Sequence, residues 1–256
     1  MADTTRYPER THGKIFLTFK EFGDSECSAT VVPGNTGSTL LTAAHCVYDR
    51  EAGFASKFMF VPGYMDGAMP HGAWVAKRLV AAKKFRADTA NVTADVAAVE
   101  LRPDEFGRRV EEVVGSRGVA FDQPRKQSVE AFGYPALPAM GVQFEGERLW
   151  MCDTRFGGKD ASTKAFPGPP AQRIGCSMTS GASGGGWVFG ASGSQGGFVE
   201  SVTSYGYPTE PEHLYGPYFS RDARRVWIAG QDSCKGKLAT LVGTDSSEKL
   251  IGTADD

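Results

Sequence analysis

Long hydrophobic runs are missing from this chain of 256 residues, although 41% of its residues are apolar. No apolar stretch approaches the roughly 18 residues that a membrane-spanning helix needs, so we expect no membrane span. The first six residues, Met-Ala-Asp-Thr-Thr-Arg, are not followed by the apolar core of a signal peptide. Either the protein is cytosolic, or this sequence is the mature portion of an exported protein.

A surplus of one charge is missing as well: 28 Lys and Arg residues face 30 Asp and Glu residues. Without a dense basic run, we expect no nucleic-acid partner. The four histidines and five cysteines form no cluster with metal-ligand spacing, so we expect neither a metal site nor a cofactor. Three histidines, His12, His71 and His213, lie in polar or turn contexts, and we expect them at the surface.

Glycine and proline are plentiful, with 32 and 14 residues, and they separate short runs of β-branched and aromatic residues. These runs lie at residues 15–19, 30–32, 38–41, 58–61, 96–101, 129–132, 187–189 and 198–203. Such spacing is typical of an all-β sandwich or barrel, and periodicity alone does not choose between them. Residues 221–231, after a Ser220 N-cap, predict a docked helix with Val226 and Trp227 on its apolar face.

Two motifs indicate a nucleophile and its base. The chain reads Thr-Ala-Ala-His-Cys around His45 and Thr-Ser-Gly-Ala-Ser-Gly-Gly around Ser183, 138 positions later. This pattern is typical of a hydrolase that activates a serine with a histidine. The third member of such a triad is an aspartate, and Asp95 begins the strand-like run Asp-Val-Ala-Ala-Val-Glu-Leu.

The order of these residues separates two classes of hydrolase. Residues 181–185 also fit the G-x-S-x-G elbow of α/β-hydrolases, but there the order is Ser, Asp, His and the serine opens a helix. Here His213 is the only histidine after Ser183, and residues 184–190 are too rich in glycine to start a helix. The order His, Asp, Ser therefore argues against the elbow.

Taken in order, the motifs resemble those of chymotrypsin/trypsin-fold serine proteases, closest in style to the bacterial V8-like (glutamyl-endopeptidase-like) branch. The resemblance covers about Gly13 to Gln231, and it includes the cysteine strand at 27–32, the substrate-binding strand at 202–206 and the last strand at 216–219. It implies two six-stranded antiparallel β-barrels, packed with the active site in the cleft between them, and a C-terminal helix.

The same resemblance divides the chain into four parts. Residues 1–12 would be an N-terminal extension, 13–120 the N-terminal barrel, and 121–232 the C-terminal barrel with its terminal helix. Residues 233–256 would be a tail, rich in Gly, Ser and charge, as is typical of flexible segments.

The resemblance also implies roles. His45 would be the general base, Asp95 would orient its ring, and Ser183 would be the nucleophile. The backbone N–H groups of Gly181 and Ser183 would form the oxyanion hole. Ser204 would add a polar contact near Asp95.

The primary specificity pocket is implied in the same way. Its residues would be Ser177 at the floor and Thr203, Ser204, Tyr205, Gly206 and Gly216 along the walls. A neutral serine at the floor argues against a preference for Lys or Arg, because no carboxylate would pair with the buried cation. Glycines on both walls would leave the pocket deep. We therefore expect an apolar or aromatic residue before the scissile bond.

One departure from the family pattern concerns activation. Trypsin-like zymogens become active when a newly cut N-terminus pairs with an aspartate just before the catalytic serine, but here that position is Ala182. That switch cannot operate in this chain. The V8-like branch also lacks the aspartate. Residues 14–17, Lys-Ile-Phe-Leu, are better interpreted as the first strand than as an activation site.

The pairing of the cysteines indicates the compartment in which the protein folds. By resemblance, Cys27 pairs with Cys46, with two buried thiols as the alternative. We expect a second bridge between Cys152 and Cys176 within the C-terminal barrel, which leaves Cys234 over. Two bridges favour an oxidising compartment. We therefore expect a secreted protein whose signal peptide and any propeptide are absent from this sequence.

Three functions are compatible with these motifs. The leading hypothesis is a secreted serine endopeptidase that acts through an acyl-enzyme intermediate. The alternatives are a catalytically silent binding module on the same fold and an esterase with the same nucleophile. We expect a monomer whose partners are polypeptide substrates and protein inhibitors.

Overall fold

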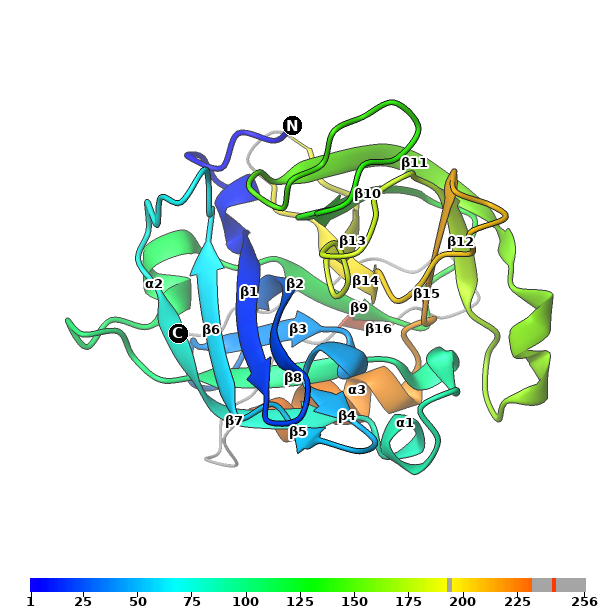
Figure 1. Ribbon diagram of the computed structural model, residues 1–256, viewed down its shortest axis with the longest axis horizontal. Coiled ribbons are helices and arrows are strands. Elements are labelled where there is room, and N and C mark those ends of the chain that lie inside the picture. Colours follow the sequence, from blue (N-terminus) through cyan, green and yellow to red (C-terminus); the bar gives the residue numbers. More distant parts are fainter. Residues whose placement is uncertain (193–194, 232–240, 243–256) are drawn as a thin grey trace.

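The structure is a computed structural model, and it describes residues 1–192, 195–231 and 241–242 (Figure 1). Its regular elements are mainly strands, and they form two barrels that lie side by side. In Figure 1 the blue and cyan strands and the blue-green β8 belong to the first barrel, and the green, yellow and orange strands from β9 to β15 belong to the second. The predicted double-barrel fold is confirmed.

Six strands close the first barrel, in the order β1-β2-β3-β8-β7-β6. Their bounds are β1 (His12–Phe19), β2 (Gly23–Val32), β3 (Thr39–Thr42), β6 (Lys57–Pro62), β7 (Trp74–Ala81) and β8 (Ala97–Leu101). All neighbouring pairs are antiparallel. Side chains such as Ile15, Leu40 and Phe60 are fully buried inside, and each stabilises the barrel by roughly 1.5–3 kcal/mol.

Short elements occupy the connections around this barrel. They are η1 (Glu9–Thr11), η2 (Ala44–Cys46), β4 (Tyr48–Asp49), β5 (Gly53–Phe54), α1 (Lys83–Ala87), η3 (Val92–Ala94) and α2 (Val110–Val114). Two of them matter for the candidate site. His45 lies within η2, and Asp95 directly follows η3.

The second sheet has the order β15-β12-β11-β10-β13-β14-β9-β16. Its elements are β9 (Gly118–Phe121), β10 (Ser128–Gly133), β11 (Trp150–Lys159), η4 (Ala161–Ala165), β12 (Gln172–Gly175), β13 (Gly186–Phe189), β14 (Phe198–Val202), β15 (His213–Gly216) and β16 (Leu241–Val242). Just after β14, an antiparallel bridge joins Tyr205 to Tyr215 on β15. This bridge closes a ring of six antiparallel strands, β10 to β15. β9 runs parallel to β14, and β16 runs parallel to β9.

The C-terminal helix α3 (Arg221–Gly230) is also as predicted, with Val226 and Trp227 buried. It packs back onto β7 and β8 of the first barrel, where Trp227 Nε1 donates to the carbonyl of Pro33 at 2.9 Å. Ser220 occupies the N-cap position, although in the part of the chain that the structure describes its side chain makes no capping hydrogen bond. Among the described helices, none has the length and apolar character needed to cross a membrane.

Both predicted disulfides are present. Cys27 on β2 is bonded to Cys46 in η2, and Cys152 on β11 is bonded to Cys176, which follows β12. Cys234 and the predicted tail, apart from the two residues of β16, lie outside the described residues.

The expectation that His12 lies at the surface is wrong. Its side chain is 1% exposed, because it stacks on Phe132 of the second barrel with 3.9 Å between ring centroids. Its Nδ1 is 2.9 Å from Thr30 Oγ1. Burial, reinforced by the charge of Arg117, holds the pKa of His12 well below its usual value. His71 and His213 are partly buried.

Candidate active site

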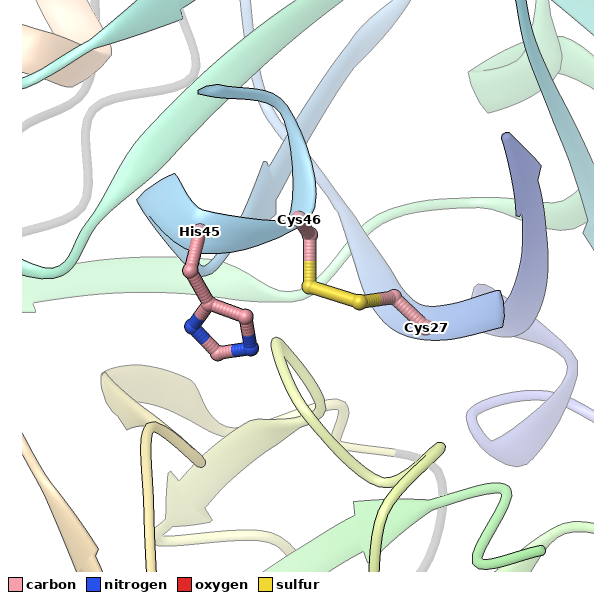
Figure 2. A group of neighbouring side chains, drawn as sticks. All are labelled: Cys27, His45 and Cys46. Atoms are coloured by element: carbon pink, nitrogen blue, oxygen red, sulfur yellow. A yellow bond between two sulfur atoms is a disulfide. The ribbon is translucent and has the colours of Figure 1, made fainter. Parts of the chain in front are cut away.

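His45 is held by the residues on either side of it in the chain. Ala43 and Ala44 are fully buried, so small side chains are needed where η2 packs on the barrel. Cys46 ties the other end of η2 to β2 through its disulfide with Cys27. Figure 2 shows the imidazole pointing away from η2, toward the yellow-green segments of the second barrel. Its side chain remains 37% exposed.

Asp95 lies beneath this ring and is almost completely buried. Its Oδ2 is 2.7 Å from His45 Nδ1, and its Oδ1 accepts a hydrogen bond of 2.9 Å from the His45 backbone N–H. The hydroxyl of Ser204 donates to Oδ2 at 2.5 Å. Three hydrogen bonds thus satisfy a carboxylate that would otherwise be costly to bury. The structure places Ser204 where the resemblance implied.

The two ionisable groups shift each other's pKa in opposite directions. Burial by itself would lower the pKa of His45, but the negative charge of Asp95 and the hydrogen bond to it outweigh burial and raise that pKa. Burial by itself would raise the pKa of Asp95, but His45 and the Ser204 hydroxyl lower it. The pair therefore favours an ionised carboxylate beside a readily protonated imidazole. The Nδ1 contact leaves His45 Nε2 available to a reacting group.

Ser183 lies in the loop before β13, and both barrels hold its backbone. Its carbonyl accepts a hydrogen bond of 2.7 Å from the N–H of Ser28 in the first barrel. The next residue, Gly184, donates to the carbonyl of Thr203 at 2.7 Å. Gly184 has φ +80°, and a Cβ there would lie 2.0 Å from Thr42 Oγ1. Glycine is required here because the loop is pressed against the first barrel.

A cavity of about 220 Å³ brings His45 and Ser183 to one surface. The residues lining it are Leu17, Phe19, Ser25, Glu26, Cys27, His45, Cys46, Ser180, Gly181 and Ser183. The cavity thus lies between the cysteine strand of the first barrel and the serine loop of the second. It joins the candidate base, the candidate nucleophile and both residues of the predicted oxyanion hole, Gly181 and Ser183.

The peptide between Ser180 and Gly181 has a defined orientation. The carbonyl of Ser180 accepts a hydrogen bond of 2.7 Å from the N–H of Ala136. Because a trans peptide is planar, the N–H of Gly181 points away from Ala136. Gly181 has φ +94°, and a Cβ there would lie 2.3 Å from the carbonyl oxygen of Tyr134. Only glycine fits this close approach.

Ala182 is fully buried, and a Cβ on Gly133 would lie 2.7 Å from the Ala182 Cβ. The position that carries an aspartate in trypsin-like zymogens is therefore apolar and enclosed in this chain. An incoming terminal ammonium would find no carboxylate partner there.

The residues predicted for the specificity pocket differ in exposure. Ser177 and Tyr205 are partly buried, and Gly206 is exposed. Thr203 is buried, and its Oγ1 accepts a hydrogen bond of 2.9 Å from Trp187 Nε1. A Cβ on Gly216 would lie 2.3 Å from the Val202 carbonyl and 3.2 Å from Trp187. Gly216 therefore allows close strand packing, with the Trp187 indole beside it.

Sequence reasoning missed an aromatic group around Tyr205. The Tyr205 ring stacks on Tyr215 with 5.0 Å between centroids. The hydroxyls of Tyr205 and Tyr207 both donate to Asp160 Oδ2, at 2.6 and 2.8 Å. Asp160 lies 45 residues before Tyr205 in the chain, so no local pattern connects them.

One group of side chains has the proximity of a metal centre but not its chemistry. In the described part of the chain, potential ligand atoms of Cys27, His45 and Cys46 lie within 4.8 Å of one another. Figure 2 shows why they do not fit a metal: the two sulfurs are bonded to each other. Cysteine binds metal as a thiolate, and a disulfide offers none.

No protein-family model matches the chain, and no curated protein matches it. Solved structures do. The protease Anisep from Arthrobacter nicotinovorans is 36% identical, with a TM-score of 0.78, over 89% of this chain and 98% of that protein. The thermostable serine protease AL20 from an extremophilic microorganism is 34% identical, with a TM-score of 0.76, over 88% of this chain and 98% of AL20.

A third structure, a Glu endopeptidase in complex with MPD, is 18% identical, with a TM-score of 0.66 over 88% of this chain and 92% of its own. At that identity it supports the fold alone. Anisep and AL20 are identical to this chain at more than a third of the aligned positions, and the alignments span nearly the whole of each protease. The chain therefore belongs to the chymotrypsin-fold serine proteases.

Proposed function

We propose that this chain is a secreted serine endopeptidase that cleaves peptide bonds through an acyl-enzyme intermediate. The observation that carries the proposal is the contact of 2.7 Å between the buried Asp95 and His45, whose imidazole lines the same cavity as Ser183. A base with a raised pKa, next to a hydroxyl and a glycine-rich backbone, is what acyl transfer requires.

In the first step, Ser183 Oγ attacks the substrate carbonyl carbon while His45 Nε2 takes the hydroxyl proton. The carbonyl oxygen becomes an oxyanion, and the N–H groups of Gly181 and Ser183 donate to it. One such donor contributes about 10² to 10³ in kcat. Asp95 stays ionised because its pKa is lowered, and it stabilises the imidazolium that forms.

In the second step, the imidazolium of His45 gives its proton to the leaving amine, and the peptide C–N bond breaks. This leaves an ester between the substrate acyl group and Ser183 Oγ. Water then attacks the ester with His45 again as base, which releases the acid and restores the hydroxyl. Each proton that His45 accepts it also returns, so the enzyme is unchanged after one cycle.

The preference for an apolar or aromatic residue before the scissile bond remains part of the proposal. It rests on the neutral Ser177, on the Tyr205 ring and on the absence of a carboxylate from the set Ser177, Thr203, Ser204, Tyr205, Gly206 and Gly216. These six residues give a buried Lys or Arg no carboxylate partner. Secretion is supported by the two disulfides. The monomeric state and the protein inhibitors remain predictions, as do the boundaries 1–12, 13–120, 121–232 and 233–256.

The test is cleavage of a diverse peptide library by the purified chain, with products identified by mass spectrometry and Ser183→Ala in parallel. We expect cleavage by the wild type, none by the variant, and labelling of Ser183 by a serine-directed phosphonate. Cleavage of esters without any cleavage of peptides would favour the esterase. A wild type that neither cleaves nor reacts with the phosphonate would favour the binding module.

A further inference from the structure

A buried lysine lies next to the candidate site. Lys14 is in the middle of β1, and its side chain is only 3% exposed. Its Nζ is 2.6 Å from Glu26 Oε2 and 3.6 Å from Glu147 Oε1. The rings of Phe16 and Tyr64 each have their centroid 5.0 Å from the same nitrogen. A buried ammonium needs such partners, and here two carboxylates and two aromatic faces provide them.

These partners connect the first barrel to the connection between β10 and β11, residues 134–149. Glu147 belongs to this connection, and its Oε2 accepts a hydrogen bond of 2.8 Å from the Tyr64 hydroxyl. The carbonyl of Tyr64 in turn accepts one of 3.0 Å from the Tyr134 hydroxyl. The charge on Lys14 therefore lies where the connection meets β1 and β2.

The other side of the same connection supports the serine loop. A Cβ on Gly146 would lie 2.8 Å from Glu26 Oε1, 3.2 Å from Lys14 Nζ and 3.2 Å from the Ala136 Cβ. Gly146 is thus packed between the ion pair and Ala136. Ala136 is the residue whose N–H holds the Ser180 carbonyl and so orients the Gly181 N–H.

We propose that Lys14 is a positioning residue for the oxyanion hole, an inference that rests on the proposed protease function. Its ammonium, paired with Glu26 and Glu147, fixes residues 134–147 against the first barrel and thereby keeps the Gly181 N–H aimed into the cavity.

The role is comparable to that of the terminal ammonium in trypsin-like zymogens, but here a side chain within β1 supplies the charge. Ala182 offers a terminal ammonium no partner, whereas Lys14 acts on the peptide between Ser180 and Gly181 through Gly146 and Ala136. The hole therefore forms without a newly cut N-terminus entering this site.

The principal test is Lys14→Met in the full chain, which keeps the aliphatic stem and removes the ammonium. Oxyanion stabilisation acts on the transition state, so we expect kcat to fall about 10- to 100-fold with KM changed by less than about twofold. The affinity for a peptide aldehyde, which forms a hemiacetal with Ser183, should fall by the same factor as kcat. If Lys14 had only a structural role, Lys14→Met would instead raise KM. The variant would then bind the peptide aldehyde and the cleavage product with the same ratio of affinities as the wild type.

Lys77→Met is the matched control. Lys77 is likewise paired with a carboxylate of the first barrel, Glu100, at 2.8 Å, although its own side chain is 47% exposed, and it lies on β7, which contributes no residue to the active-site cavity. Glu100 keeps Arg78 as a partner at 3.3 Å. We expect kcat of this variant to equal that of the wild type. Circular dichroism and Tm show whether each variant is folded.

A second variant covers the case in which Lys14→Met does not fold. Glu147→Gln keeps the Lys14–Glu26 pair, removes one link to the connection and touches no cavity residue, and we expect kcat to fall about threefold to tenfold with KM unchanged. A six-residue extension before Met1, whose side chain is 70% exposed, should leave kcat unchanged.

The inference is overturned if folded Lys14→Met has the kcat of the wild type. If Lys14→Met does not fold, the same result in Glu147→Gln overturns it. Either result leaves the proposed protease function unaffected. Loss of kcat in the extended chain would also overturn the inference, because it would indicate a role for the terminal amine. A wild type that is inactive toward peptides and the phosphonate would overturn the proposed function and this inference together.

Discussion

The first barrel and the second barrel hold their parts of the candidate site by different kinds of interaction. In the first barrel, hydrogen bonds to a side chain dominate: Asp95, directly after η3, accepts two hydrogen bonds from His45 in η2. In the second, backbone geometry dominates, with Gly181 and Gly184 at positive φ and no room for a Cβ at either. The first arrangement depends on which residues are present, and the second depends on how closely distant segments approach.

The largest effect is expected from breaking the first arrangement. Asp95→Asn should lower kcat about 10⁴-fold, because the amide no longer fixes the required tautomer of His45 or stabilises its charged form. KM for a peptide substrate, measured in steady state, should change little. Retention of more than a tenth of the wild-type kcat would show that Asp95 is not the orienting residue.

Disturbing the backbone geometry of the second barrel should lower kcat by a smaller factor. Gly181→Ala places a Cβ 2.3 Å from the Tyr134 carbonyl, so the peptide must move and one oxyanion donor is lost. We expect kcat to fall about 10²-fold. Gly190→Ala is the control, since Gly190 also has positive φ (+68°) but nothing within 4 Å.

The control should therefore lose only about 1–2 kcal/mol of stability, from backbone strain, and keep its kcat. Equal kcat losses in the two alanine variants would mean that backbone strain alone explains the effect. Steady-state kinetics and urea unfolding of both variants distinguish these outcomes.

The dependence of kcat/KM on pH sharpens the comparison, because it reports on the His45–Asp95 pair and not on the backbone geometry around Gly181. His45 must be neutral to accept a proton, and its pKa is raised, so kcat/KM should fall as the pH drops, with a midpoint above the ordinary histidine value near 6.5. In Gly181→Ala the midpoint should stay where it is in the wild type. A wild-type profile that is flat down to pH 4 would contradict His45 as the base.

The smallest loss of kcat is expected from a change at the contact between the two barrels. Ser204 belongs to the second barrel, yet its hydroxyl donates to Asp95 in the first. Ser204→Ala removes one of three donors and leaves the two from His45, so we expect a threefold to tenfold fall in kcat, with the pKa of Asp95 moving up toward its ordinary value. A loss as large as that of Asp95→Asn would show that Ser204, rather than His45, holds the carboxylate.

The amino-acid sequence by itself determined the parts that rest on the identity of a few residues. The motifs around His45, Asp95 and Ser183 predict the candidate reacting groups and indicate the family, and the two predicted cysteine pairs are both bonded. Short apolar runs between turn residues predict the strands, and the spacing of Val226 and Trp227 predicts α3. These features are readable because each is local or tied to a specific motif.

Only the tertiary structure decided which side chains meet across distant segments. It buried His12 against Phe132, although the local sequence around His12 is polar. It placed Trp187 beside Gly216, where the family resemblance implied a deep pocket, and it brought Asp160 to the Tyr205 hydroxyl. It also enclosed Lys14 between Glu26 and Glu147, which are 121 positions apart. The contacts of His12 and Lys14 depend on the packing of one barrel against the other, and those of Trp187 and Asp160 on how distant segments meet within the second barrel. No local pattern in the chain records either kind of contact.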